Sequence, residues 1–293
     1  MSKQTLASLT LIGATALWGI YWVPVLWLES RGISGMIAVA MLNIAPAFLL
    51  LVLAFRSQAT RPEMVQALMV GAIAGLGFGL YSAGIVYGSV VRATLLFYMT
   101  PIWSTLIGIL VLSERVGPKR WIAIAVGLSG VALLVSAGPQ ATLNIGDGFA
   151  LLSGLMWAIA AVGIKKSPEL PLTGLTGAQF ASTTVLALVL AFLFGAELPR
   201  VQEWFDALPT ATLIGLGVMT PSIVAIFWAQ KHVFPGRAGL LMMSEVLVAV
   251  ITAAIFLPEE RLGLVQWIGA AMIVGTFFIE TMTLPKMARR HSA

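Results

Sequence analysis

The chain alternates between long apolar stretches and short polar ones. Ten stretches are apolar over the length of a helix, and most charged residues lie in the connections between them. A helix needs about 20 apolar residues to cross a hydrocarbon core of ~30 Å, and only helices or closed barrels satisfy every backbone amide there. We therefore predict an all-α integral membrane protein with ten transmembrane helices. The expected segments are residues 6–27, 33–55, 64–88, 93–112, 121–137, 148–164, 175–194, 211–230, 238–257 and 264–282.

Two parts of the chain repeat the same order of residues. Residues 92–121 read RATLLFYMTPIWSTLIGILVLSERVGPKRW, and residues 237–267 read RAGLLMMSEVLVAVITAAIFLPEERLGLVQW. In both, Arg-Ala precedes an apolar run, an acidic cluster follows it, and Gly and Trp come next. We predict two related halves, 1–138 and 139–293, with a polar linker at their junction.

The N-terminal run also has a counterpart in the second half. Residues 1–19 resemble a signal peptide, yet residues 14–20 match residues 153–159, with Trp18 opposite Trp157. We therefore expect this run to be retained as the first helix.

Lys and Arg are distributed unevenly between alternate connections. If the N-terminus is cytoplasmic, 13 of the 17 Lys and Arg fall on the cytoplasmic side and 4 on the other. This bias predicts that both termini are cytoplasmic. Each half then has five helices, so the second half enters the membrane in the opposite direction. Inverted repeats of this kind are typical of secondary transporters, whose substrate site lies near the bilayer midplane.

Composition supports a membrane protein and argues against several other classes. The chain is 59% hydrophobic and 10% charged, whereas soluble domains carry about 25% charged residues. The net charge of +5 comes from scattered residues, a pattern that suits a lipid surface better than nucleic acid. Cys is absent, His occurs twice and no Walker motif is present, so we expect no metal, no cofactor and no direct use of ATP. The expected partners are a small-molecule substrate and membrane lipids, for a monomer or weak homodimer.

Several short motifs are notable, and most of them recur at matching places in the two halves. The recurring ones are Arg92-Ala93 and Arg237-Ala238, Ser113-Glu114-Arg115 and Glu259-Glu260-Arg261, and the pair Trp18 and Trp157, whereas Pro101 occurs in the first half alone. On these motifs, nearly the whole chain resembles the EamA repeats of the drug/metabolite transporter superfamily. Within that superfamily it is most similar to bacterial aromatic amino acid exporters. The resemblance implies a ten-helix inner-membrane carrier, often an exporter of amino acids or other small metabolites. One departure is Glu245-Val246, where the family commonly has Glu-Pro, so we expect the ninth helix to lack the proline kink of the fourth.

Glu245 is the strongest candidate for a functional residue. It lies about eight residues into the ninth segment, or roughly 12 Å along the helix. A charge at that depth costs at least ~2.5 kcal/mol unless it meets water or a partner. Glu245 is therefore expected to contact a substrate amine or to carry a proton. The structural alternative is a bond to a Lys, a Ser or a Trp N–H.

Aromatic and small polar residues near mid-span complete the predicted site. Trp and Tyr suit a substrate with an apolar body and a polar head, whereas buried hydroxyl and amide groups serve either substrate binding or interhelical bonds. The predicted substrate-binding residues are Trp18, Tyr21, Asn43, Tyr81, Ser82, Tyr98, Trp157, Ser244 and Glu245.

Prolines and glycines suggest where the helices bend and where they pack closely. Pro24, Pro46, Pro101 and Pro221 are expected to interrupt helices, because proline lacks a backbone N–H. Pro24, Pro101 and Pro221 are the predicted hinges. GxxxG spacings in the third segment predict close helix packing.

The function predicted from these features is secondary transport. The chain is expected to export small metabolites, above all aromatic or hydrophobic amino acids, by alternating access through a central cavity. The main alternative is a multidrug or other metabolite carrier of the same superfamily. A membrane-embedded enzyme is less favoured, because no cluster of acids or His occurs on one helix face. A channel is the remaining alternative.

Overall fold

The computed structural model describes residues 2–136, 144–258 and 262–281. These residues are almost entirely helical and contain no strand. The predicted junction between the halves and the Glu259-Glu260-Arg261 motif lie outside the described residues. The elements are α1 (Lys3–Trp18), α2 (Trp22–Glu29), α3 (Gly35–Phe55), α4 (Arg61–Val86), α5 (Val90–Phe97), α6 (Thr100–Leu112), α7 (Pro118–Ser136), α8 (Ile145–Lys166), α9 (Leu172–Leu193), α10 (Val201–Ile214), the π-helix η1 (Gly215–Met219), α11 (Thr220–Gln230), α12 (Pro235–Leu241), α13 (Ser244–Phe256) and α14 (Leu264–Thr281).

Eight helical stretches in the described parts of the chain are long and apolar enough to cross a membrane. They are Lys3–Glu29, Gly35–Phe55, Arg61–Val86, Val90–Leu112, Ile145–Lys166, Leu172–Leu193, Val201–Gln230 and Pro235–Phe256. Each coincides with one expected segment. The fifth and tenth expected segments correspond to α7 and α14. Within α14, residues Leu264–Thr276 form an apolar helix that is shorter than the eight stretches above. The all-α membrane class is therefore confirmed, whereas ten crossings and the inversion of the halves stay predictions.

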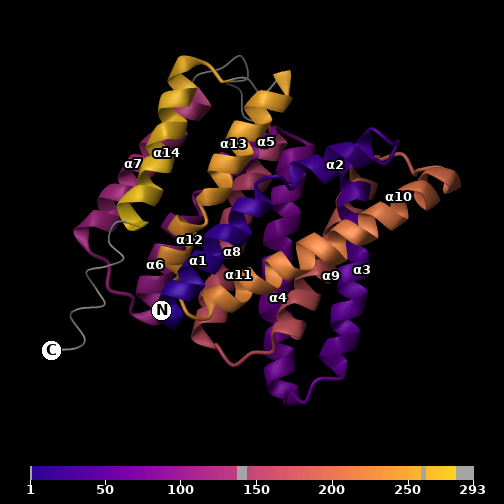
Figure 1. The fold of residues 1–293 in the computed structure, drawn as a ribbon, viewed down its shortest axis with the longest axis horizontal. Helices are drawn as coiled ribbons and strands as arrows, with labels where there is room; N and C mark the ends of the chain where they lie inside the picture. The colour runs from indigo at the N-terminus through magenta and orange to yellow at the C-terminus, as the bar shows by residue number, and fades with distance from the viewer. Residues whose placement is uncertain (1, 137–143, 259–261, 282–293) are drawn as a thin grey trace.

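Helices distant in sequence lie side by side (Figure 1). α4 packs against α8 and α9, and α3 packs against α9. α7 and α14 pair with each other at one edge, and α1 contacts both α11 and α13. This arrangement surrounds the middle of the molecule with α1, α4, α5, α8, α11 and α13.

Glycines in α4 allow its close contact with α9. A Cβ on Gly71 would collide with the carbonyl oxygen of Leu175, and one on Gly75 would collide with the backbone of Gln179 and the hydroxyl of Ser182. The predicted close packing through GxxxG spacings is therefore confirmed.

Several expected segments are divided into two helices. α1 ends at Trp18 and α2 begins at Trp22, ahead of Pro24. Pro101 is the second residue of α6, and Pro221 is the second residue of α11, directly after η1. The missing N–H of each proline explains why a new helix begins there.

One expectation about these interruptions was wrong. Pro46 does not interrupt its helix, because α3 is continuous across it. Pro46 has no N–H to donate to the carbonyl of Leu42. Gly215 of η1 packs closely against that carbonyl oxygen instead. The ninth segment has no proline at residue 246, yet the helix breaks at Met242 and Met243.

Tighter hydrogen bonds account for the break between α12 and α13. The N–H of Glu245 bonds the carbonyl of Met242 at 3.0 Å, and that of Val246 bonds Met243 at 3.1 Å. These bonds span three residues rather than four, a pattern that narrows the turn.

The eighth stretch begins earlier than expected, at Val201 rather than residue 211. The carboxylate of Glu203 accepts a 2.7 Å bond from the N–H of Arg200 and caps α10. Because α10 carries charged residues on an otherwise apolar helix, its first turns do not resemble a membrane span in the sequence. α10 extends toward the edge of the molecule (Figure 1).

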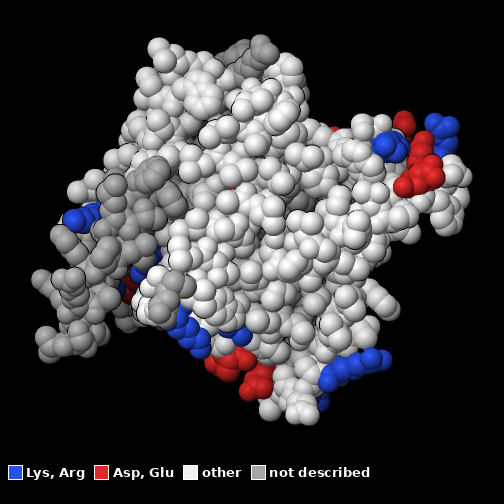
Figure 2. Space-filling view, viewed as in Figure 1, with Lys and Arg blue, Asp and Glu red and all other residues white. Residues whose placement is uncertain are grey.

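Charged side chains on the face in Figure 2 gather at the upper right and along the lower edge. The broad area between them is largely uncharged. Exposed apolar side chains such as Phe48, Leu110 and Phe192 lie on helices that face outward. An uncharged band between two charged ends is the surface that a bilayer requires.

Candidate functional site

A small cavity lies where the interrupted helices meet the long ones. We refer to it as the central cavity, and its volume is about 10 Å³, roughly the space of one water molecule. Binding sites for small molecules usually measure about 300–1,000 Å³. The structure therefore represents a closed arrangement. The lining residues are Trp18, Phe78, Tyr81, Phe97, Trp157, Ile226, Met242 and Glu245.

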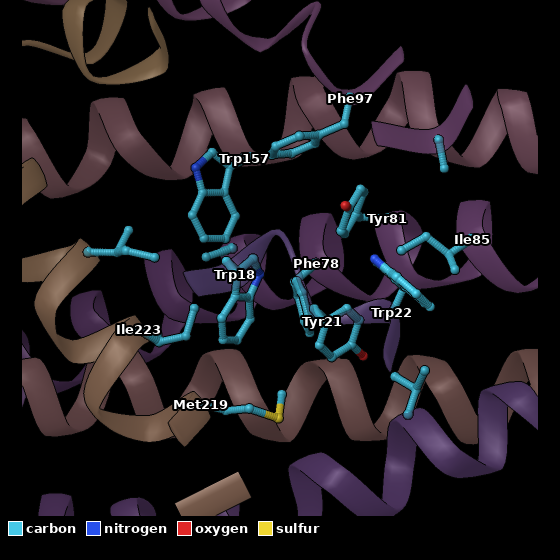
Figure 3. Close-up of a cluster of buried hydrophobic side chains, with 14 of the residues drawn as sticks. Trp18, Tyr21, Trp22, Phe78, Tyr81, Ile85, Phe97, Trp157, Met219 and Ile223 are labelled. Carbon is cyan, nitrogen blue, oxygen red and sulfur yellow. The ribbon is translucent and has the colours of Figure 1, made fainter. Parts of the chain in front are cut away.

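Aromatic rings from several helices make most of this lining. Trp18 of α1 lies 5.2 Å from Phe78 of α4, centroid to centroid, and Figure 3 shows Trp157 pointing from its helix toward Trp18. The rings of Tyr81 and Phe97 are 5.1 Å apart. A cavity bounded by ring faces accommodates an apolar group or an organic cation.

Glu245 contributes the carboxyl group of the central cavity. It is the second residue of α13 and is 1% exposed. Its Oε2 lies 2.9 Å from the hydroxyl oxygen of Tyr98, whereas its Oε1 has no hydrogen-bond partner among the described residues. A buried oxygen without a donor is rare in folded proteins. Oε1 is therefore available to a ligand that donates hydrogen bonds.

Tyr98 joins the two helix breaks. It follows α5 directly, and its hydroxyl donates to the carbonyl of Met242, which follows α12, over 2.5 Å. The same hydroxyl oxygen contacts Glu245. The residue that holds the carboxyl group thus also links the two interrupted helices.

Trp157 carries a second buried group without a partner. Its Nε1 donor has no acceptor among the described residues, although the side chain is buried in the lining. Among the described residues, the side chains that line the cavity thus include a buried acceptor without a partner, on Glu245, and a buried donor without a partner, on Trp157. These two groups match a ligand that carries both a hydrogen-bond donor and an acceptor.

The remaining predicted site residues take different positions. Tyr21 stacks on Trp18 at 5.5 Å and its hydroxyl lies 3.2 Å from that of Ser82, just outside the lining. Asn43 donates to the carbonyl of Val39 at 2.7 Å, within α3. Ser244 donates to the carbonyl of Ile12 at 2.9 Å, and so connects α13 to α1.

The predicted residues that meet in the cavity are therefore Trp18, Tyr81, Trp157 and Glu245, with Tyr98 supporting them. The lining residues that sequence reasoning missed are Phe78, Phe97, Ile226 and Met242. Phe78 is three residues before Tyr81, and that helical spacing could have indicated it. Ile226 and Met242 differ in no visible way from lipid-facing residues.

Two buried ion pairs lie on either side of this region along the helices. Arg92 of α5 pairs with Asp147 of α8, near the beginning of both helices. Beyond the end of α6, Glu114 pairs with Arg120 of α7, and the Oε2 of Glu114 has no partner in the described structure. In the described parts of the chain, no three His, Asp or Glu side chains come together as a metal site would require.

Comparison with known proteins identifies the family. The sequence model of the EamA-like transporter family matches residues 5–136 and again residues 144–281. An uncharacterized transporter of Archaeoglobus fulgidus is 32% identical over 202 residues, which are 68% of this chain and 70% of that protein. A solved crystal structure superposes with a TM-score of 0.67 and 18% identity, and covers 99% of both chains. That similarity shows the fold alone.

Two further relatives have names that state what they carry. A probable terminal-alkyne amino-acid exporter of Streptantibioticus cattleyicolor is 26% identical over 76% of both chains. A riboflavin transporter of Rhizobium johnstonii is 27% identical over 69% of this chain and 65% of its own. Since the family model matches most of the chain, this multi-span membrane protein belongs to the EamA-like transporter family.

Proposed function

We propose that this chain is a secondary transporter that exports small metabolites, in the first place aromatic or hydrophobic amino acids, by alternating access through the central cavity. The observation that carries the proposal is the pairing of the unbonded Oε1 of Glu245 with a lining of aromatic rings. An ammonium group would donate to the carboxylate, and an apolar side chain would pack on the rings.

The unused donor of Trp157 supports an amino acid as substrate. A carboxylate or carbonyl of the substrate would accept from Nε1, which has no other acceptor among the described residues. The relative named as an amino-acid exporter is consistent with this substrate class. The riboflavin transporter supports the alternative of another metabolite with an aromatic ring system.

The helix contacts support the proposal of two repeats, 1–138 and 139–293. α4 packs on α8 as α11 packs on α1, and α6 packs on α8 as α13 packs on α1. If each helix is replaced by its counterpart in the other half, the contact of α4 with α8 becomes that of α11 with α1, and the contact of α6 with α8 becomes that of α13 with α1. Combined with the distribution of Lys and Arg, this exchange supports inverted halves with both termini cytoplasmic, in an inner membrane.

Closure of the cavity favours alternating access over a permanent pore. A space of about 10 Å³ holds no amino acid, so the substrate enters only after helices move apart. The breaks at Tyr98 and at Met242, together with the proposed hinges Pro24, Pro101 and Pro221, provide places for such movement. The working unit is proposed as a monomer or weak homodimer surrounded by lipid, with no nucleic-acid partner.

Uptake into proteoliposomes tests the proposal. Purified protein should exchange radiolabelled phenylalanine in a saturable manner, and Glu245→Gln should lower kcat/KM by about 10- to 100-fold, the loss of a charged hydrogen bond of ~1.5–3 kcal/mol. Glu197→Gln, on an exposed loop, is the matched control and should transport like the wild type. Riboflavin and tetraphenylphosphonium, assayed in parallel, test the metabolite and multidrug alternatives. Unsaturable flux of small ions would indicate a channel instead.

A further inference from the structure

The hydrogen atoms around Glu245 can be counted from the contacts of its neighbours. Tyr98 has one hydroxyl hydrogen, and its oxygen lies 2.5 Å from the carbonyl oxygen of Met242. A carbonyl only accepts hydrogen bonds. The hydrogen of Tyr98 is therefore engaged with Met242 and is not available to Glu245.

Tyr81, the other tyrosine that faces Glu245, also uses its hydrogen elsewhere. The hydroxyl of Thr94 donates to the carbonyl of Val90 at 2.7 Å, so at its 3.0 Å contact with Tyr81 it can only accept. Tyr81 is consequently the donor in that pair. Neither tyrosine has a second hydrogen for the carboxyl group.

In the part of the chain that the structure describes, no Lys, Arg or His lines the cavity around Glu245 either. The groups that face it and are able to titrate are Tyr81 of α4 and Tyr98, which follows α5. The other lining groups come from α1, α4, α5, α8 and α11 and from the residue that follows α12. They are Trp18, Phe78, Phe97, Trp157, Ile226 and Met242, and none of these carries a charge. A carboxylate here would have neither a free donor nor a cation among the described residues, and burial of such a charge costs several kcal/mol.

A protonated carboxyl group on Glu245 would supply the hydrogen that the contact with Tyr98 lacks. If Oε2 carries the hydrogen, it donates to the Tyr98 oxygen at 2.9 Å, and Tyr98 donates onward to Met242. Each hydrogen is then used once and no charge is buried. The bond chain Glu245–Tyr98–Met242 also connects the break after α5 to the break after α12.

We propose that Glu245 is the proton-binding site of a substrate–proton exchange, and that its protonated carboxyl group holds the cavity closed through Tyr98. The inference rests on the proposed function, since it assigns the ion that is exchanged for the substrate. In the exchange, the O–H bond of Glu245 breaks and its proton passes to water that enters the opening cavity. The carboxylate then accepts from the ammonium group of the substrate, so one proton is exchanged for one ammonium group. Tyr98 keeps its own hydrogen throughout.

Infrared spectroscopy of the reconstituted full chain tests the proton itself. The wild type should show the carbonyl stretch of a neutral carboxyl group, and the band should be absent from Glu245→Gln and should decline as the pH is raised. Glu197→Gln should retain it. A difference spectrum between wild type and Glu245→Gln without this band would overturn the proposal.

Thiol labelling tests the link to closure, and the chain is suited to it because it contains no cysteine. Ile226→Cys places a thiol in the lining, and Ser30→Cys, on an exposed turn, corrects for the pH dependence of thiol reactivity. Corrected labelling of the Ile226→Cys variant should rise about tenfold or more with pH, as an open state of ~1–10% becomes dominant. With Glu245→Gln, whose amide replaces the donor, labelling should stay slow at every pH.

The two possible failures are distinguishable. Equal pH dependence with and without Glu245→Gln would overturn the exchange mechanism, whatever the substrate. Neither assay uses a substrate, so a failure to transport phenylalanine would contradict only the proposed function.

Discussion

Arg92 and Asp147 form a two-pronged ion pair that joins α5 to α8. Nη2 of Arg92 lies 2.5 Å from Oδ2 of Asp147, and Nε lies 3.1 Å from Oδ1. The side chains are 11% and 3% exposed. The same carboxylate accepts a 3.0 Å bond from the N–H of Asn144, which caps α8. Because α5 and α8 belong to different proposed halves, this pair connects the halves on one side of the central cavity.

Asp147→Asn should destabilise the protein strongly. Removing one partner of a buried ion pair costs about 3–5 kcal/mol, whereas an exposed pair contributes at most ~1 kcal/mol. Glu203→Gln, which breaks the pair with Arg200, a side chain that is 88% exposed, is the control. Thermal unfolding in detergent should show a much larger decrease in Tm for Asp147→Asn. Equal decreases would mean that the buried pair adds nothing to stability.

The two buried ion pairs should control opposite openings of the cavity. Glu114→Gln weakens the pair with Arg120 beyond α6, and Asp147→Asn weakens the pair with Arg92. In vesicles of known orientation, an impermeant thiol reagent should label Ile226→Cys faster from the cytoplasmic side in the Glu114 variant. In the Asp147 variant, labelling should be faster from the other side. Faster labelling from the same side in both would contradict alternating access.

Gly71→Ala should destabilise the contact between α4 and α9. The added methyl group would collide with the carbonyl oxygen of Leu175 and lie 2.9 Å from the Cβ of Ala178, and such overpacking costs about 1–3 kcal/mol. The matched control is Gly13→Ala in α1, where nothing lies within 4 Å of the new Cβ. Thermal unfolding should show a lower Tm for Gly71→Ala alone. An unchanged Tm would show that the two helices can separate without cost.

Trp157→Phe should weaken substrate binding and leave the packing of the helices nearly unchanged. The change keeps a ring in the lining and removes the Nε1 donor, which has no acceptor among the described residues. Substrate affinity should fall about 2- to 10-fold, since one hydrogen bond contributes ~0.5–1.5 kcal/mol, while Tm should fall little. Trp267→Phe, at a half-exposed position of α14, is the control. A lower Tm with unchanged affinity would assign the indole a structural role.

The sequence by itself determined where the apolar helical stretches lie, apart from the first turns of α10, and it indicated the family. Apolar runs of membrane length have one physical outcome, because no other local structure satisfies the backbone in hydrocarbon. The sequence also indicated Glu245, Trp18 and Trp157 as site residues. An acid near the middle of an apolar segment is costly, and the two tryptophans occupy matching positions near mid-span in the two halves. These three residues do meet in one cavity.

Only the tertiary structure decided which apolar residues face that cavity and which polar residues serve helix packing. In a membrane protein both the lipid-facing and the inward-facing sides of a helix are apolar, so periodicity does not separate Ile226 or Met242 from their neighbours. The break at Met242 was likewise invisible, because no proline marks it and the Tyr98 hydroxyl that bonds its carbonyl comes from a distant segment. The state of Glu245 depends on the same contact, since the hydrogen count around its carboxyl group requires the positions of Tyr81 and Tyr98.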